Sequence, residues 1–113
     1  MIIYVDIDKT ICRDPNAGAS GCAPPAYDQA IPIPENITKV NLLHDQGHAI
    51  IYWTARGSKT GLDWQPTTER QLREWGAKYN ELKMGKPYYD LFIDDKAFRI
   101  EELNNYAFYP RIS

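Results

Sequence analysis

The sequence has few cysteines, which argues against a fold held together by disulfides or zinc. Among its 113 residues are only Cys12 and Cys22, ten positions apart in a segment with the composition of a loop. Neither histidine, His44 or His48, lies at a zinc-ligand spacing from them. We therefore expect two free thiols rather than a disulfide.

The sequence also lacks a long apolar run and an excess of either charge. No stretch approaches the roughly 18 apolar residues of a membrane span, and no secretory signal is visible at the N-terminus. Thirteen basic and 15 acidic side chains give a net charge of −2. This balance gives no electrostatic reason to expect nucleic acid or a membrane as a partner. We expect a cytoplasmic protein that acts on a small molecule.

The composition that remains is that of an ordinary globular chain, with 43% hydrophobic and 25% charged residues. The length, without a repeat or a composition break, predicts a single domain over residues 1–113. Residues 13–33 are dense in Gly, Pro, Ala, Asn and Ser. So long a loop in a small domain predicts a flap beside a functional site.

Strand-like and helix-like segments alternate along the chain. The predicted buried strands are 2–7 (IIYVDI), 48–53 (HAIIYW) and 90–94 (DLFID). The predicted helices run from Pro34 to near Gly47, from Pro66 to about Gly76 and, more weakly, over 97–105. We predict neither a helix nor a strand for the short apolar stretch 79–82. The alternation predicts an α/β fold with a parallel sheet that has helices on both faces.

Each predicted strand is followed by polar side chains. Asp6 and Asp8 end the first, Thr54 follows the second, and Asp94 and Asp95 end the third. Because the carboxyl ends of parallel strands share one edge of the sheet, we expect the three groups to converge there. Four carboxylates so close together repel unless a cation neutralises them, and an all-oxygen set favours Mg²⁺.

A carboxylate at such a site can act as a nucleophile toward phosphorus. Asp6, at the strand end, is the candidate, and Asp8 is placed to protonate the leaving oxygen and then deprotonate water. Thr10 is expected to hold the turn that follows. Thr54, with neighbouring backbone N–H groups such as that of Ala55, is expected to bind a phosphoryl oxygen.

A phosphoryl group also needs a cation from the protein. Lys86, in the turn MGKP, is our choice, and Lys83 is its main rival. Arg56 and Lys59 fit two interpretations equally well. They could bind a second anionic group of the substrate, or they could be solvated charges of a loop. Trp64 and, in the flap, Tyr27 are read either as substrate contacts or as side chains that fill hydrophobic seams.

These residues together resemble the haloacid dehalogenase (HAD) superfamily of phosphohydrolases. DIDKT (6–10) is similar to its first motif, DxDxT/V, and YWTARG (52–57) to its second. Lys86 in GKP matches the third, and FIDDK (92–96) the acidic fourth. The lysine stands only eight residues before Asp94, closer than in most members.

The resemblance implies a Rossmann-like, doubly wound core. It makes Asp6 the nucleophile and a Mg²⁺ ligand, and Asp8 the acid/base and a ligand through its carbonyl. It makes Thr54 and Lys86 phosphate ligands and Asp94 a metal ligand, with Asp95 in support. The likeness is closest to small capless members found with capsule and surface-polysaccharide biosynthesis, through phrases such as GHAIIYWTARG and GKPYYDLFIDDKA.

Without a cap domain, the flap, the 57–66 loop or another subunit of a homo-oligomer must complete the pocket. The leading hypothesis is a Mg²⁺-dependent phosphomonoesterase that acts on a small metabolite, most plausibly a sugar phosphate. The alternatives are a phospho-accepting domain like bacterial receivers, a binding protein without catalysis, and phosphoryl transfer to an acceptor other than water.

Overall fold

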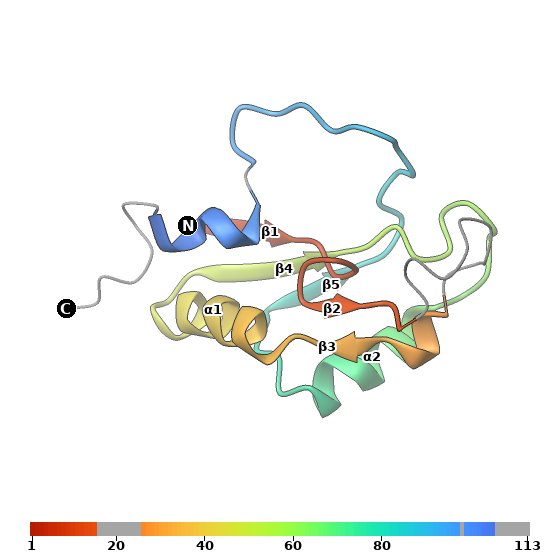
Figure 1. Ribbon diagram of the computed structural model, residues 1–113, viewed down its shortest axis with the longest axis horizontal. Helices are drawn as coiled ribbons and strands as arrows, with labels where there is room; N and C mark the ends of the chain where they lie inside the picture. Colours follow the sequence, from red (N-terminus) through yellow and green to blue (C-terminus); the bar gives the residue numbers. More distant parts are fainter. Residues whose placement is uncertain (16–25, 98, 106–113) are drawn as a thin grey trace.

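Three parallel strands form the centre of the computed structural model, which describes residues 1–15, 26–97 and 99–105 (Figure 1). The sheet has the order β1-β4-β5. Its strands are β1 (Ile2–Val5), β4 (Ala49–Trp53) and β5 (Glu81–Lys83). β4 is the central strand because it pairs with β1 on one edge and with β5 on the other, and its residues 50–52 are apolar and buried. The chain is therefore an α/β protein with a mostly parallel sheet, as predicted.

Two helices connect the strands. They are α1 (Pro34–Asp45) and α2 (Gln65–Glu74), and each has a proline in its first turn. Proline suits that position because its missing N–H would have no partner there. α1 buries Ile37, Val40 and Leu43, spaced as one helix face requires. The predicted helices that begin at Pro34 and Pro66 are confirmed to within two residues at their ends.

The core lies on one face of the sheet. Ile50 and Tyr52 of β4 form one hydrophobic cluster with the buried side chains of α1 and with Leu72 of α2. On the other face, the side chains of Ile2 and Tyr4 are 72% and 49% exposed. The expectation of helices on both faces is therefore wrong for the described residues, since these two apolar side chains of β1 have no helix over them.

The flap segment is partly ordered. β2 (Cys12–Arg13) and β3 (Ile31–Pro32) pair as a short antiparallel ribbon, and η1 (Tyr27–Gln29) is a single 3-10 turn. Cys12 is free and buried. Residues 16–25, which include Cys22, lie outside the described residues, so the prediction of a free Cys22 stays a prediction.

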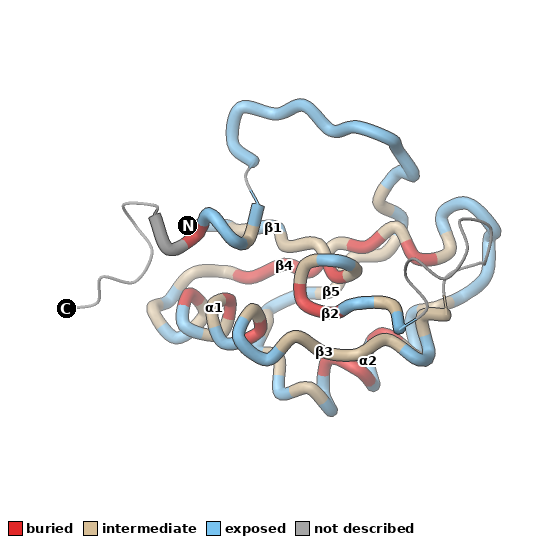
Figure 2. The backbone as a smooth tube through the Cα atoms, viewed as in Figure 1, coloured by how far each residue is buried: buried red, intermediate tan, exposed pale blue. Residues whose placement is uncertain are grey.

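The predicted third strand is wrong. Residues 90–94 have no strand partner among the described residues, and the third strand is instead β5, in the stretch to which we assigned no element. β5 takes the free edge of β4, with Leu82 beside Tyr52. The chain then leaves the body of the molecule as an exposed loop over residues 87–97 (Figures 1 and 2).

The chain returns from this loop to the core at η2 (Ile100–Asn105), a 3-10 helix rather than the α-helix predicted over 97–105. Leu103 of η2 is buried in the main cluster, and Ile100 packs against it. In the described parts of the chain, no helix has the length and apolar character needed to cross a membrane.

Candidate active site

The chain forms a tight turn directly after β1, and this turn presents Asp6 and Asp8 to a cavity. The carbonyl of Ile7 accepts the N–H groups of Thr10 and Ile11, at 3.1 and 2.9 Å. The N–H of Lys9 donates to Cys12 O at 2.8 Å, with Lys9 in the left-handed region at φ 66°. Because Ile7 is fully buried, the turn is anchored in the core between the two acidic residues.

Thr10 supports the turn through its backbone. Its carbonyl accepts a hydrogen bond of 2.9 Å from the side-chain amide of Asn36, in the first turn of α1. The predicted supporting role of Thr10 therefore involves main-chain groups that tie the turn to α1.

Asp6 lies beside the ammonium group of Lys86. Its Oδ1 is 3.7 Å from Lys86 Nζ, and the Lys86 side chain is only 12% exposed. The N–H of Lys86 donates to Thr54 O at 3.0 Å, which fixes the lysine against the end of β4. Burial raises the pKa of Asp6, and the charge of Lys86 partly offsets this.

The rival lysine lies elsewhere. Lys83 Nζ donates to the hydroxyl of Tyr4 at 3.1 Å, on the exposed face of the sheet. Of the two candidates, the structure brings Lys86 to Asp6.

Asp8 is held by a two-point ion pair with Arg56. Arg56 Nε and Nη2 donate to the two carboxylate oxygens of Asp8 at 3.0 and 2.9 Å. The guanidinium is fully buried, whereas the Asp8 side chain is 34% exposed. Burial acts to lower the pKa of Arg56, but its hydrogen bonds and charge interaction with Asp8 raise it more. Arg56 therefore stays charged and fixes the orientation of the Asp8 carboxylate.

Further contacts explain why a buried arginine is tolerated here. Arg56 Nη1 donates to Thr68 Oγ1 at 3.0 Å and to Gln71 Oε1 at 2.6 Å. Its guanidinium carbon lies 4.9 Å from the centre of the Tyr27 ring. Gln71 in turn donates to Tyr27 O at 2.6 Å and so links α2 to the flap.

Both sequence-based readings of Arg56, a solvated charge or a ligand of a second anion, are therefore wrong. The guanidinium is enclosed by the protein and fully occupied by Asp8 and by two polar side chains of α2. Sequence analysis missed those two residues, Thr68 and Gln71. The sequence did contain a sign that they are buried. They stand three positions apart on the helix face that also carries the apolar Leu72.

Thr54 does not reach the cavity. Its side chain is 1% exposed, and its Oγ1 accepts the N–H of Arg56 at 3.1 Å. The predicted direct contact of this hydroxyl with phosphate is therefore not present. The residue instead orients the backbone of Arg56 and, through its carbonyl, that of Lys86. Ala55, the other predicted phosphate-binding residue of this strand end, does line the cavity.

The cavity at this edge of the sheet has a volume of about 290 Å³. Its lining combines charged groups with three tyrosine rings, two of which lie on the segment that follows Lys86. The lining residues are Asp6, Asp8, Lys9, Tyr27, Ala55, Arg56, Lys86, Pro87, Tyr88 and Tyr89. Charged and aromatic groups in one small cavity suit a ligand with an anionic end and an uncharged body.

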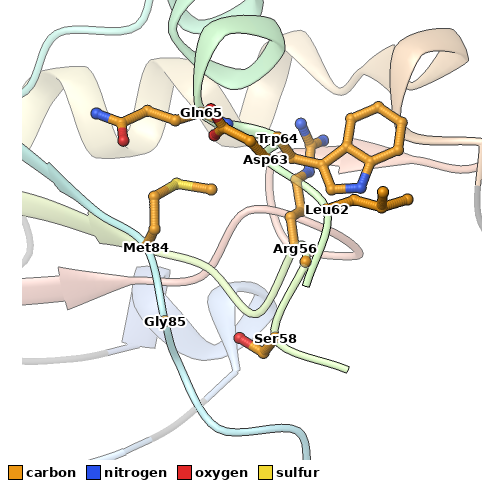
Figure 3. Close-up of a pocket in the computed structure, with 9 residues that line it drawn as sticks. Arg56, Ser58, Leu62, Asp63, Trp64, Gln65, Met84 and Gly85 are labelled. Atoms are coloured by element: carbon orange, nitrogen blue, oxygen red, sulfur yellow. The ribbon is translucent and has the colours of Figure 1, made fainter. Parts of the chain in front are cut away.

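Arg56 also lines a second cavity, of about 190 Å³ (Figure 3). Trp64 and Met84 contribute apolar surface to it, and Ser58 and Gln65 contribute polar groups. Trp64 also packs edge-on against Tyr27, with ring centres 5.1 Å apart. Trp64 therefore fills a hydrophobic seam by packing against Tyr27, whereas Tyr27 forms part of the wall of the candidate site.

Asp94 and Asp95 do not join Asp6 and Asp8. They lie on the exposed segment, where Asp94 Oδ1 accepts the N–H of Lys96 at 3.1 Å, and neither lines a cavity described above. The predicted convergence of all the carboxylates is therefore wrong within one chain. The physical reason is that residues 90–94 are not paired with β1 and do not run along the sheet toward its carboxyl edge.

The described residues of one chain do not complete a metal site. No group of three or more His, Cys, Asp or Glu side chains in the described ranges is arranged to hold a metal ion. Asp6 and Asp8 are two carboxylates, and Asp8 is already paired with Arg56. A hard cation such as Mg²⁺ takes more oxygen ligands than this pair offers, although water supplies part of the set in many sites.

Comparisons with known proteins bear on the fold alone. No protein-family model and no curated protein matches the chain. The crystal structure of an MCSG target from Vibrio cholerae superimposes with a TM-score of 0.74, at 26% sequence identity, and the match covers 89% of this chain and 85% of that one. The chain therefore shares its α/β fold with a solved bacterial structure whose name states no activity.

Proposed function

We propose that this protein is a cytoplasmic phosphomonoesterase of the HAD type. One observation carries the proposal: the Asp6 carboxylate lies 3.7 Å from the Lys86 ammonium, on the same cavity as an Asp8 carboxylate oriented by Arg56. A carboxylate nucleophile, a phosphate-binding cation and a second, positioned carboxylate are the three groups that covalent phosphate-ester hydrolysis requires.

In the first step, an oxygen of Asp6 attacks phosphorus. The P–O bond to the leaving group breaks, and the leaving oxygen takes a proton from Asp8, which is left as a carboxylate paired with Arg56. The result is an aspartyl-phosphate. Lys86 offsets the negative charge of the phosphoryl oxygens as they approach Asp6.

In the second step, water attacks the phosphorus of this intermediate and gives up a proton to Asp8. Inorganic phosphate leaves, and the Asp6 carboxylate is restored. Arg56 keeps the Asp8 carboxylate in one orientation through both steps. Cys12 and Arg56 together occupy three of the four acceptor positions of the Asp8 carboxylate, and Asp8 lines the cavity.

The walls of the cavity favour a small phosphorylated metabolite, and we propose a sugar phosphate. Tyr27, Tyr88 and Tyr89 offer ring faces and hydroxyl groups of the kind that contact sugar rings. A volume of about 290 Å³ accommodates a monosaccharide phosphate.

We also propose that hydrolysis depends on Mg²⁺. A divalent ion would reduce the repulsion between the Asp6 carboxylate and the phosphoryl oxygens. Because the residues of one chain supply only part of its ligands, the steps above are derived for the protein groups alone.

The test is the release of phenolate from p-nitrophenyl phosphate, with and without Mg²⁺. We expect turnover by the parent protein, none by Asp6→Asn, and a loss of about 10²–10⁴-fold in Asp8→Asn. Lys86→Ala should lose most of the activity, whereas the matched variant Lys83→Ala should retain it. Turnover that survives in Asp6→Asn would refute the covalent mechanism. Turnover that persists after chelation with EDTA would refute the proposed metal dependence.

A further inference from the structure

Gln71 is a buried side chain of α2 that links the candidate proton donor to the flap. It is 4% exposed, and both ends of its amide are hydrogen-bonded. Its Oε1 accepts Arg56 Nη1 at 2.6 Å, and its Nε2 donates to Tyr27 O at 2.6 Å. A buried amide whose two ends are both used in this way is held in one orientation.

The two partners of Gln71 both belong to the candidate site. Arg56 donates to both carboxylate oxygens of Asp8, at 3.0 and 2.9 Å, and Tyr27 lines the same cavity as Asp8. The two partners also contact each other, since the guanidinium carbon of Arg56 lies 4.9 Å from the centre of the Tyr27 ring. Gln71, Arg56 and Tyr27 therefore form a closed ring of contacts.

Asp8 depends on this ring for its orientation. Its side chain is 34% exposed, whereas that of Arg56 has no exposure, so the guanidinium is the fixed partner of the pair. Two side chains of α2, Thr68 and Gln71, hold the remaining nitrogen of that guanidinium. A proton donor must lie within hydrogen-bond reach of the leaving oxygen, and small displacements cost much of its effect.

We propose that Gln71 is a positioning residue for proton transfer by Asp8. It holds Arg56 at one end of its amide and the flap at the other, and so fixes the Asp8 carboxylate relative to the Tyr27 wall of the cavity. The inference rests on the proposed function for the role of Asp8 as proton donor. Gln71 is not among the residues that line the cavity, so it acts through Arg56 and Tyr27.

The chemistry of an amide suits both partners of Gln71. Arg56 needs an acceptor, and the carbonyl of Tyr27 needs a donor. A glutamate would keep the acceptor, lose the donor and bring a second carboxylate to the guanidinium, in competition with Asp8. A methionine of similar size would lose both, and Arg56 Nη1 would keep only Thr68 Oγ1, at 3.0 Å.

The first experiment compares two substrates that differ in their need for a proton. p-Nitrophenolate is a weak base and leaves readily without one, whereas the leaving oxygen of phenyl phosphate depends more on the proton donor. We expect Gln71→Met to lower kcat/KM for phenyl phosphate about fivefold more than for p-nitrophenyl phosphate. The control is Gln29→Met, at an exposed glutamine of the flap, which should change neither value. A merely structural role would lower both values equally, and equal losses would overturn the inference.

Gln71→Glu provides a second variant if the methionine variant does not fold. It keeps the size of the side chain and the acceptor for Arg56. Because its carboxylate competes with Asp8, we expect the same selective loss on phenyl phosphate. Parent values of kcat/KM on both substrates would overturn the inference.

The second experiment does not depend on activity. The Nε–H group of Arg56 is enclosed and donates to Asp8 at 3.0 Å, so its exchange with water should be slow. We expect nitrogen-15 NMR to show exchange about tenfold faster in Gln71→Met and unchanged in Gln29→Met. The signal is assigned by its loss in Arg56→Lys. Unchanged exchange in Gln71→Met would overturn the inference, because Asp8 and Thr68 would then hold the guanidinium without Gln71.

The two experiments together separate this inference from the proposed function. Faster exchange in Gln71→Met, in a parent protein that hydrolyses neither phosphate, would refute the proposed function and leave Gln71 as the residue that holds Arg56 against Asp8. An active parent protein with equal losses on the two substrates would refute the inference and leave the proposed function standing.

Discussion

At the scale of single residues, the pairing of Asp8 with Arg56 has the largest energetic consequence. The guanidinium has no exposure, and its partners Asp8, Thr68 and Gln71 all lie within 3.0 Å. A lysine has neither the planar geometry nor enough donors to replace these contacts. The stability of the molecule and the geometry of its candidate site thus depend on the same side chain.

We expect Arg56→Lys to lower the free energy of unfolding by about 3 kcal/mol, the low end for breaking a buried ion pair, because Asp8 keeps some contact with water. The measurement is urea denaturation. Arg70→Lys is the matched control, since Arg70 forms only an exposed pair with Glu74 at 3.5 Å and should change stability by less than about 0.5 kcal/mol. Equal effects of the two substitutions would contradict the buried pair.

Asp6 affects the stability of the fold in a different way, because burial raises the pKa of its carboxyl group. A raised pKa means that the folded chain binds this proton more tightly than the unfolded chain does. The ionised group therefore destabilises the fold at neutral pH, and this destabilisation disappears as the pH falls through the pKa of Asp6.

Accordingly, Asp6→Asn should raise the melting temperature at pH 7 by about one degree at most, because the Asp6 side chain is 39% exposed and solvent weakens the effect of burial, and the gain should shrink toward about pH 4. Calorimetry at the two pH values measures the difference. The exposed Asp28→Asn is the control and should show no such trend. A lower melting temperature for Asp6→Asn at pH 7 would show that its pairing with Lys86 outweighs the effect of burial.

At the scale of elements, the loop between β4 and α2 sets the position of Arg56. Gly57 adopts φ +82°, and a Cβ atom there would overlap the backbone oxygen of Leu62. The same loop is closed by a 2.7 Å hydrogen bond from the N–H of Gly61 to Gly57 O. The glycine is therefore required for close backbone approach as well as for its dihedral angle.

This loop offers a matched pair of glycines. Gly61 has φ +80° and open space around it, so Gly61→Ala should cost about 1 kcal/mol from backbone strain alone. Gly57→Ala adds the overlap and should cost about 2–3 kcal/mol, with a further loss of hydrolysis as Arg56 shifts. Denaturation and p-nitrophenyl phosphate assays measure the two effects. Equal losses in stability would show that Leu62 moves aside freely.

Elements with their own strong local signals were predicted well. α1 has proline at its start and an apolar stripe, and β4 is a continuous apolar run, so local periodicity determines both. β5 has only three residues, Glu81 to Lys83, with two charges, and its pairing depends on the free edge that β4 presents. No property of the segment alone indicates that edge.

At the scale of the whole molecule, the chain measures 45 × 30 × 24 Å, elongated for its length. Apolar side chains of residues 91–93 and of β1 account for much of the exposed hydrophobic surface of the described residues.

The sequence by itself determined the α/β class, the two helices, the central strand and the acidic turn after β1, because each depends on residues that are neighbours along the chain. The tertiary structure alone decided that Lys86 rather than Lys83 lies beside Asp6, that Arg56 is buried against Asp8, that the Thr54 hydroxyl accepts a backbone N–H, and that Asp94 lies outside the cavity. Each of these depends on which segments lie side by side in space, and neither residue type nor periodicity encodes that directly.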